Sequence, residues 1–276
     1  MTTALVLGGG GVTGIAWETG LLFGLEQAGV RVRDADRLVG TSAGSTVVAQ
    51  LASGTDLSEL YRRQAGGLVA EKAAAFSGAD LWRLVSTLVF TRDRAKALRR
   101  LGAESQARVR PGEAAERRAI IAERVPVDVW PDRDVHIPAV HVETGLLRVF
   151  TREDGVALIN AVGASCAVPL VWPPVEIDGQ HYIDGGLPYP ANVQLASGCD
   201  TVLVIAPITR GLGLGTSVKA QVRALGGDVR SVVLSPDREA KRSMGRNSLD
   251  PAARKASAIA GLAQAERVVE SVRGLF

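Results

Sequence analysis

Residues 5–14 read LVLGGGGVTG, a short apolar run followed by four consecutive glycines. The apolar run is typical of a buried parallel strand, and the apolar residues after the glycines recur at helical spacing up to Gly29. Glycines at such a junction leave the backbone uncovered, so N–H groups at the start of the helix can bind an anion. Two anions fit this description: the phosphate of a nucleotide, or the oxyanion that forms during ester cleavage.

A second glycine motif, VGTSAGS at residues 39–45, follows a second predicted strand and opens a second helix. It contains the pattern G-x-S-x-G, with Ser42 at its centre between Gly40 and Gly44. On a sharp strand-to-helix turn this pattern exposes a serine hydroxyl above the sheet, and the small neighbours avoid a collision. The β-α-β-α order predicts a parallel sheet whose two glycine turns meet at the carboxyl edge of the strands. The second motif therefore favours a nucleophilic serine.

A nucleotide-binding interpretation keeps some support. Gly9, Gly11 and Gly14 match G-x-G-x-x-G between a strand and a helix. Asp34 and Asp36 lie about 20 residues further on, where a ribose-binding acid belongs. That acid should end the second strand, however, whereas Asp34 precedes the stretch DRLVG and Asp36 begins it. A nucleotide-binding oxidoreductase therefore remains open as an alternative function.

Charge and cysteine content narrow the classes of partner and cofactor. The 276 residues carry 32 basic and 29 acidic side chains, and a net charge of +3 is too small to indicate nucleic-acid binding. Cys166 and Cys199 show no CxxC spacing, and the three histidines lie far from them, so we expect no metal and no other cofactor. The N-terminus lacks a basic segment, and no apolar run reaches the roughly 18 residues of a membrane span. We expect a cytoplasmic protein.

The remaining pattern predicts one α/β domain over residues 1–276 with a helical insertion at about 56–125. The chain contains no internal repeat and no linker-like stretch. Further predicted elements are strands at 138–142, 146–150, 201–207 and 231–235, a helix near 155–165, a hairpin closed at Asp178-Gly179, and a long helix after Pro251.

The base that would activate Ser42 is not an obvious histidine. A triad in the order of the α/β-hydrolases needs a histidine after the acid, and none follows Asp184. His136 and His141 lie in strand-like sequence, and His181 could serve only with an earlier acid. Asp184, in YIDGG, ends a predicted strand before two glycines that permit a tight turn, so its carboxylate is the better candidate.

Together these motifs resemble the patatin-like phospholipases, lipid acyl hydrolases with a Ser-Asp dyad. LVLGGGGVTG is similar to their oxyanion loop, GTSAG to their nucleophile elbow, and ASCAVPLVWPPVEIDGQHYIDGG to the block that ends in their catalytic aspartate. The resemblance covers residues 4–54 and about 157–207, while the helical middle and the tail match loosely. It implies a three-layer α/β fold with a central, mostly parallel sheet, helices on both faces and a helical insertion. The site residues that it implies are Ser42 and Asp184 as catalytic pair, Gly9, Gly10 and Gly11 as oxyanion hole, and Gly14, Gly40, Gly44, Gly185 and Gly186 as motif glycines.

The resemblance also implies an activity, hydrolysis of lipid or fatty-acyl carboxylic esters without a cofactor. Ser42 would attack the ester carbonyl while Asp184 accepts its proton. Because no histidine titrates in this scheme, we expect activity to persist below about pH 6.5. Thr13 stands where the family usually has Arg or Lys, which weakens the expectation of a phospholipid head group. A catalytically silent lipid-binding protein is a second alternative.

Two segments of the predicted insertion could contact an acyl chain or a membrane surface. LWRLVSTLVF, residues 81–90, has a wide apolar face that favours an ordinary buried helix over a lid or acyl pocket. Residues 91–125 hold ten basic and five acidic side chains, which favours a solvated helix face and leaves transient contact with a membrane surface as an alternative. The sequence predicts no oligomeric state.

Overall fold

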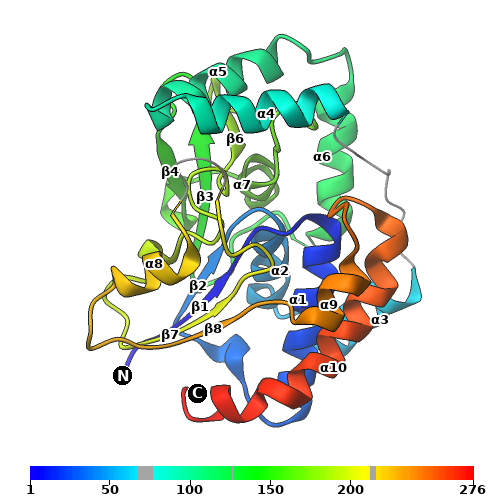
Figure 1. Cartoon of the computed structure of the whole chain (residues 1–276), viewed down its shortest axis with the longest axis vertical. Helices are drawn as coiled ribbons and strands as arrows, with labels where there is room; N and C mark the ends of the chain where they lie inside the picture. The colour runs from blue at the N-terminus through cyan, green and yellow to red at the C-terminus, as the bar shows by residue number, and fades with distance from the viewer. Residues whose placement is uncertain (68–76, 126, 212–215) are drawn as a thin grey trace.

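The structure, a computed structural model, describes residues 1–67, 77–125, 127–211 and 216–276 (Figure 1). These residues form a central sheet in the order β5-β6-β3-β2-β1-β7-β8, with β4 paired to β3. The strands are β1 (Thr3–Leu7), β2 (Arg37–Gly40), β3 (Asp134–His141), β4 (Leu147–Phe150), β5 (Val175–Ile177), β6 (Gln180–Asp184), β7 (Thr201–Ile205) and β8 (Arg230–Leu234).

The sheet has a parallel half and an antiparallel half, joined by strand β3. Strands β3, β2, β1, β7 and β8 pair in parallel, whereas β4 and β6 run antiparallel to β3, and β5 antiparallel to β6. The predicted hairpin between β5 and β6 is confirmed: Asp178 and Gly179 have φ of 52° and 74°, as a two-residue turn of this kind requires. The expected mixed, mostly parallel sheet is therefore observed.

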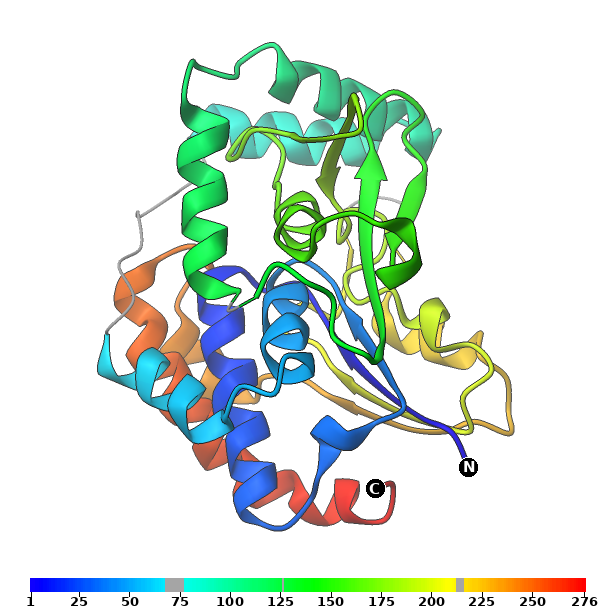
Figure 2. The ribbon, with the colours of Figure 1, turned by 180° about the vertical axis from the view of Figure 1, so that it is seen from behind.

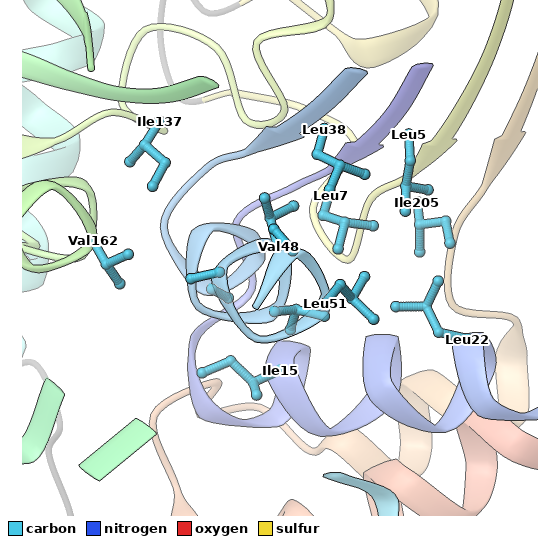
Figure 3. Close-up of a cluster of buried hydrophobic side chains, with 14 of the residues drawn as sticks. Leu5, Leu7, Ile15, Leu22, Leu38, Val48, Leu51, Ile137, Val162 and Ile205 are labelled. Carbon is cyan, nitrogen blue, oxygen red and sulfur yellow. The ribbon is translucent and has the colours of Figure 1, made fainter. Parts of the chain in front are cut away.

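Helices cover both faces of the sheet because strand residues of both orientations are apolar. In β1, Leu5 and Leu7 face helices α1 (Gly11–Gln27) and α2 (Ala43–Ala52), in a cluster that Figure 3 shows with Leu22 and Val48. Ala4 and the other alternate residues face a second cluster beneath α8 (Val218–Arg223) and the short helix Val193–Ala196. Burying one such leucine contributes about 1.5–3 kcal/mol, so the two clusters hold the sheet between its layers.

The C-terminal helix α10 (Arg254–Arg273) confirms the long helix predicted after Pro251, and it packs against α1 (Figures 1 and 2). Gly20 and Gly24 make this approach possible, since a Cβ on either would overlap Ala258 or Ala265 of α10. Helix α9 (Arg238–Met244) and helix α3 (Leu57–Gly66) lie beside the pair. Within the described ranges, no helix combines the length and apolar character needed to cross a membrane.

The segment predicted as a helical insertion, about 56–125, contains α3, α4 (Gly78–Phe90), α5 (Arg94–Gln106) and α6 (Glu113–Arg124), and its residues 68–76 lie outside the described part. Leu84 and Leu88 of α4 pack with α5 onto β3 and β6. The expectation that α4 is an ordinary buried helix is wrong. Trp82 and Phe90 are 67% and 75% exposed, because only a narrow stripe of α4 reaches the sheet.

Candidate active site

Ser42 occupies a strained turn between β2 and α2. Its φ of 51° and ψ of −117° lie in a region that non-glycine residues rarely adopt, as expected of a nucleophile elbow. The backbone N–H of Ser42 donates a hydrogen bond to Ser165 Oγ at 2.9 Å, which ties the turn to helix α7 (Leu158–Ser165). Gly44 lies against β1 so closely that a Cβ would overlap the Leu7 carbonyl. The surrounding backbone therefore holds the strained turn in place.

The glycine loop after β1 lies beside this turn. Gly11, the first residue of α1, has a φ of 61°, and a Cβ on Gly10 would overlap Pro207. Among the residues that the structure describes, the amides of Gly10 and Gly11 have no hydrogen-bond acceptor. Gly9 instead donates its N–H to the Pro190 carbonyl at 2.8 Å, so the expectation that this amide faces an oxyanion is corrected. An N–H already bonded within the fold cannot be counted as a free donor.

The remaining motif glycines serve close packing around the same region. Gly40 lies against the first turn of α2, and Gly14 lies in contact with Pro207. A Cβ on Gly185 would overlap the Pro138 carbonyl of β3, while one on Gly186 would press on the Asp184 carboxylate. Each motif therefore contains at least one position where another segment leaves no room for a side chain.

Strand register brings Asp184 to the level of Ser42. Val39 of β2 pairs with His136 of β3, so continuing β2 by three residues places Ser42 level with Ala139. Ala139 is also the β-partner of Asp184, the last residue of β6. Because β6 runs antiparallel to β3, the carboxyl end of β6 lies beside the middle of β3. The chain that follows β2 turns at the same level on the other side of β3. The two candidate residues therefore meet across β3.

The Asp184 carboxyl group is buried, and burial raises its pKa from 3.8 to about 6. Hydrogen bonds from the Ser42 side chain and from the Gly186 backbone N–H (2.7 Å) oppose this rise, as does the positive charge of Arg117. The result is a carboxylate that is more basic than usual and already hydrogen-bonded to the candidate nucleophile. A carboxyl group with a pKa of about 6 takes up a proton only slightly below pH 6.5, so the expectation that activity persists below that pH stays a prediction.

Asn192 links the two turns and is missed by the sequence analysis. Its side-chain NH₂ donates to Thr41 Oγ1 at 3.1 Å and to the carbonyls of Gly185 and Tyr189 at 3.0 Å. The residue is fully buried with a φ of 51°, a conformation that Asn tolerates better than most residues. A single Asn in a loop carries no pattern, so only the tertiary structure identifies this role.

An apolar cavity of about 190 Å³ opens next to these residues. It is bordered by Ser42, Asp184 and the glycine loop on one side, and by Leu88 of α4 on another. Its further apolar lining comes from Val168, Leu187, Ile208 and Leu249. Such a cavity can receive a hydrocarbon group whose polar end reaches the serine.

The three histidines lie away from this cavity. Within the described part of the chain, His136 bonds Asp134 (2.6 Å), His141 bonds Gln180 (2.7 Å) and His181 contacts Gln106 (3.2 Å). None of them borders the cavity that Ser42 and Asp184 share. In the same residues, no group of three or more His, Cys, Asp or Glu side chains is arranged to hold a metal ion.

The position of Asp36 does not suit the ribose-binding acid that the nucleotide interpretation requires. Asp36 accepts hydrogen bonds from the backbone and side chain of Thr3 at 2.8 Å, at the amino end of β1. The glycine loop follows the carboxyl end of the same strand, so the length of β1 separates the two. A ribose-binding acid must lie beside the glycine turn.

A family model described as "Patatin-like phospholipase" matches residues 5–197. Among solved structures, VipD from Legionella pneumophila is similar at 12% identity and a TM-score of 0.49, over 98% of this chain and 67% of VipD. The type III effector protein ExoU is similar at 16% identity and a TM-score of 0.43, over 98% of this chain and 53% of ExoU. No curated protein gives a significant match. Because the family model matches more than half of the sequence, the chain belongs to the patatin-like phospholipase family.

Proposed function

We propose that this patatin-like phospholipase family member is a serine hydrolase of lipid carboxylic esters, with Ser42 as nucleophile and Asp184 as its base. Family membership suggests a lipid acyl hydrolase. The observation that carries the finer assignment is the meeting of a strained serine and a buried, hydrogen-bonded carboxylate beside free backbone amides. No other described carboxylate or histidine borders the same cavity as Ser42.

The proposed reaction has two halves. Ser42 Oγ attacks the ester carbonyl carbon, and its proton passes to Asp184. The tetrahedral oxyanion accepts hydrogen bonds from the N–H groups of Gly10 and Gly11, each worth about 10²–10³ in rate. The C–O bond to the leaving alcohol breaks, Asp184 returns the proton to that alcohol, and an acyl-Ser42 ester remains. Water then loses a proton to Asp184 and attacks the acyl carbonyl carbon. The bond to Ser42 Oγ breaks, the fatty acid is released, and Asp184 returns the proton to the serine oxygen.

The experiment that tests this assignment combines covalent labelling with turnover. A fluorophosphonate probe should label wild-type protein at Ser42, identified by peptide mass spectrometry, and should not label Ser42→Ala. A panel of p-nitrophenyl esters of increasing chain length should be cleaved by the wild type and not by Ser42→Ala. Ser53→Ala is the matched control, because Ser53 Oγ bonds the Ala49 carbonyl at the far end of α2 and does not border the cavity. Lipid binding without labelling or turnover would instead support the catalytically silent alternative.

We further propose that the exposed face of α4 rests on an anionic membrane surface. Trp82, Val89 and Phe90 share this outward face, and Leu88, on the inner side of the same helix, borders the cavity beside Ser42. Exposed cations lie at Arg92, which follows α4, and on α5, which packs against α4, at Lys96, Arg99 and Arg100. Aromatic side chains beside cations suit the interface of an anionic bilayer. Substrate would then enter from the lipid side.

A further inference from the structure

Arg117 of helix α6 and Trp172, in the segment between α7 and β5, stack on each other inside the protein. Arg117 is 8% exposed, and its Cζ atom lies 3.9 Å from the centre of the Trp172 ring. A guanidinium over the face of a tryptophan ring is attracted by the electrons of the ring. The negative charge of Asp184 also acts favourably on Arg117. The two side chains therefore form a stable pair, which we call the Arg117–Trp172 stack.

The Arg117–Trp172 stack lies between three spaces of different size. Arg117 and Trp172 both border a narrow space of about 30 Å³, and Ser42 borders it as well. Arg117 also borders a cavity of about 420 Å³, and Trp172 borders another of about 220 Å³. Ser42 borders neither of these two larger cavities. The stack therefore forms a partition between the space beside Ser42 and both of them.

The narrow space continues the cavity that can receive a hydrocarbon group. Ser42, Val168 and Leu249 border both the narrow space and the 190 Å³ cavity. Pockets that enclose drug-sized ligands measure about 300–1,000 Å³, so the 190 Å³ cavity alone is small for a long hydrocarbon chain. A chain that is too long for this cavity and enters the narrow space meets the Arg117–Trp172 stack.

The backbone that carries Trp172 is held by specific contacts. Leu170 has a φ of 66°, which residues other than glycine rarely adopt, and its N–H donates to Ser105 Oγ at 2.9 Å. The N–H of Trp172 donates to the Val168 carbonyl at 2.9 Å, and Pro173 follows. Strained backbone persists only where the surrounding structure holds it. Trp172 is thus fixed in the partition by a turn that the rest of the fold supports.

We propose that the Arg117–Trp172 stack sets the upper length of the acyl chain that the protein accepts. The acyl chain of the ester occupies the 190 Å³ cavity and the narrow space, and the stack excludes it from the two larger cavities. Without the Trp172 ring, the narrow space opens into the 220 Å³ cavity, which shares Val109 and Pro173 with the 420 Å³ cavity. This inference rests on the proposed function and adds a determinant of chain length to it.

Trp172 is the residue to vary, because a change of Arg117 would also alter the charge that acts on Asp184. p-Nitrophenyl esters from butanoate to dodecanoate, each kept below the concentration at which it aggregates, are compared in wild type, Trp172→Phe and Trp172→Ala. Each methylene group that becomes buried should raise kcat/KM by about 4-fold. In the wild type we expect this rise to stop within the series.

In Trp172→Ala the rise should continue to longer chains. On dodecanoate the variant should exceed the wild type by about 10-fold or more, the effect of two further buried methylene groups. Trp172→Phe, which keeps a smaller ring, should lie between the two. Unchanged turnover of butanoate shows that Trp172→Ala folds, and if it does not fold, Trp172→Phe is judged by the same criterion.

Tyr61→Ala is the matched control, because it also removes a stacked aromatic ring, 5.0 Å from Phe23, and Tyr61 borders none of these cavities. Its dependence on chain length should equal that of the wild type. A wild type whose kcat/KM rises through the whole series, or a Trp172→Ala that stops at the same chain length, overturns the proposal. An equal loss on every ester with a shifted acid limb would assign Trp172 to Asp184, through Arg117, and overturns it as well.

Binding in the Ser42→Ala background separates failure of this inference from failure of the catalytic proposal. Isothermal titration with hexanol, octanol and decanol measures the affinity for a hydrocarbon chain without a reaction. Decanol should bind the double variant Ser42→Ala, Trp172→Ala about 10-fold more tightly than Ser42→Ala, whereas hexanol should bind both equally. Equal affinities for decanol overturn the partition even if Ser42 proves to be the nucleophile. The expected difference supports the partition even if Ser42 does not.

Discussion

The Ser42–Asp184 crossing and the helices of the insertion are built by opposite means. At the crossing, backbone meets backbone: Gly44 touches β1, Gly185 touches β3, and Asn192 bonds both turns. In the insertion, by contrast, side chains form cavity walls: Leu88 borders one cavity and Arg117 borders another. Close backbone contacts fix geometry and tolerate little change, whereas side chains at cavity walls can be replaced singly. We therefore expect substitutions at the crossing to affect catalysis, and those in the insertion to affect what is bound.

The largest effect is expected from Asp184→Asn. The amide keeps the shape of the carboxylate and still accepts the Gly186 N–H, but it cannot take the proton of Ser42. We expect kcat to fall by about 10³–10⁴-fold, measured on a neutral soluble ester. His181→Ala, which removes the histidine nearest to Asp184 in sequence, should change kcat less than about 2-fold. A large loss in His181→Ala together with a small loss in Asp184→Asn would reverse the assignment of the base.

The same substitution should stabilise the fold at neutral pH. The folded pKa of Asp184, about 6, lies above its ordinary value of 3.8, so the folded state favours the protonated carboxyl. The stability that this group contributes is therefore lost as the pH rises from about 4 to above 6. At pH 7, Asp184→Asn should raise the free energy of unfolding by about 2–3 kcal/mol, and the gain should vanish near pH 4. Urea titrations at both pH values measure this, and an equal gain at both would contradict it.

An intermediate effect is expected from Asn192→Gly. Glycine adopts the same positive φ, so the change isolates the hydrogen bonds of the side chain from backbone strain. Losing buried bonds to Thr41 and Gly185 should lower the free energy of unfolding by about 1–3 kcal/mol, and loosening the crossing should lower kcat by about 10-fold. Chemical denaturation and steady-state kinetics measure the two effects. Unchanged kcat despite lost stability would show that Asn192 does not position the two turns.

The smallest effect on chemistry is expected on the exposed face of α4. The double variant Trp82→Ser, Phe90→Ser should leave kcat on a soluble ester within about 2-fold, because neither side chain borders the cavity. Its partitioning onto vesicles of phosphatidylglycerol and phosphatidylcholine should weaken by at least about 10-fold, measured by co-sedimentation. Ile259→Ser, which alters an exposed apolar residue on α10, is the control. Equal vesicle binding by the double variant and the control would contradict the membrane proposal.

The sequence predicted the strands, the two glycine turns and the family because those features are local. An apolar run bounded by glycine, or G-x-S-x-G after a strand, has the same meaning wherever it occurs. The hydrogen bond that the Gly9 N–H donates within the fold could not be predicted in this way, since its acceptor, the Pro190 carbonyl, is distant in the chain. The hydrogen bonds of Asn192 and the stacking of Arg117 on Trp172 likewise depend on segments that only the folded chain brings together. For α4, the sequence showed how wide the apolar face is, but it did not show which part of that face other segments would cover.

The contact between α1 and α10 has a consequence for how the protein is made. Strand β1 and helix α1 are synthesised first, yet β1 needs β7 beside it and α1 needs α10 across Gly20 and Gly24. During translation, the apolar faces of β1 and α1 therefore stay uncovered until β7 and α10 have been synthesised. We therefore expect the N-terminal half to be more prone to aggregate during translation than after the C-terminal helix has packed against it. A fragment limited to residues 5–197 would keep every motif and still lack β7 and α10, which pack against β1 and α1.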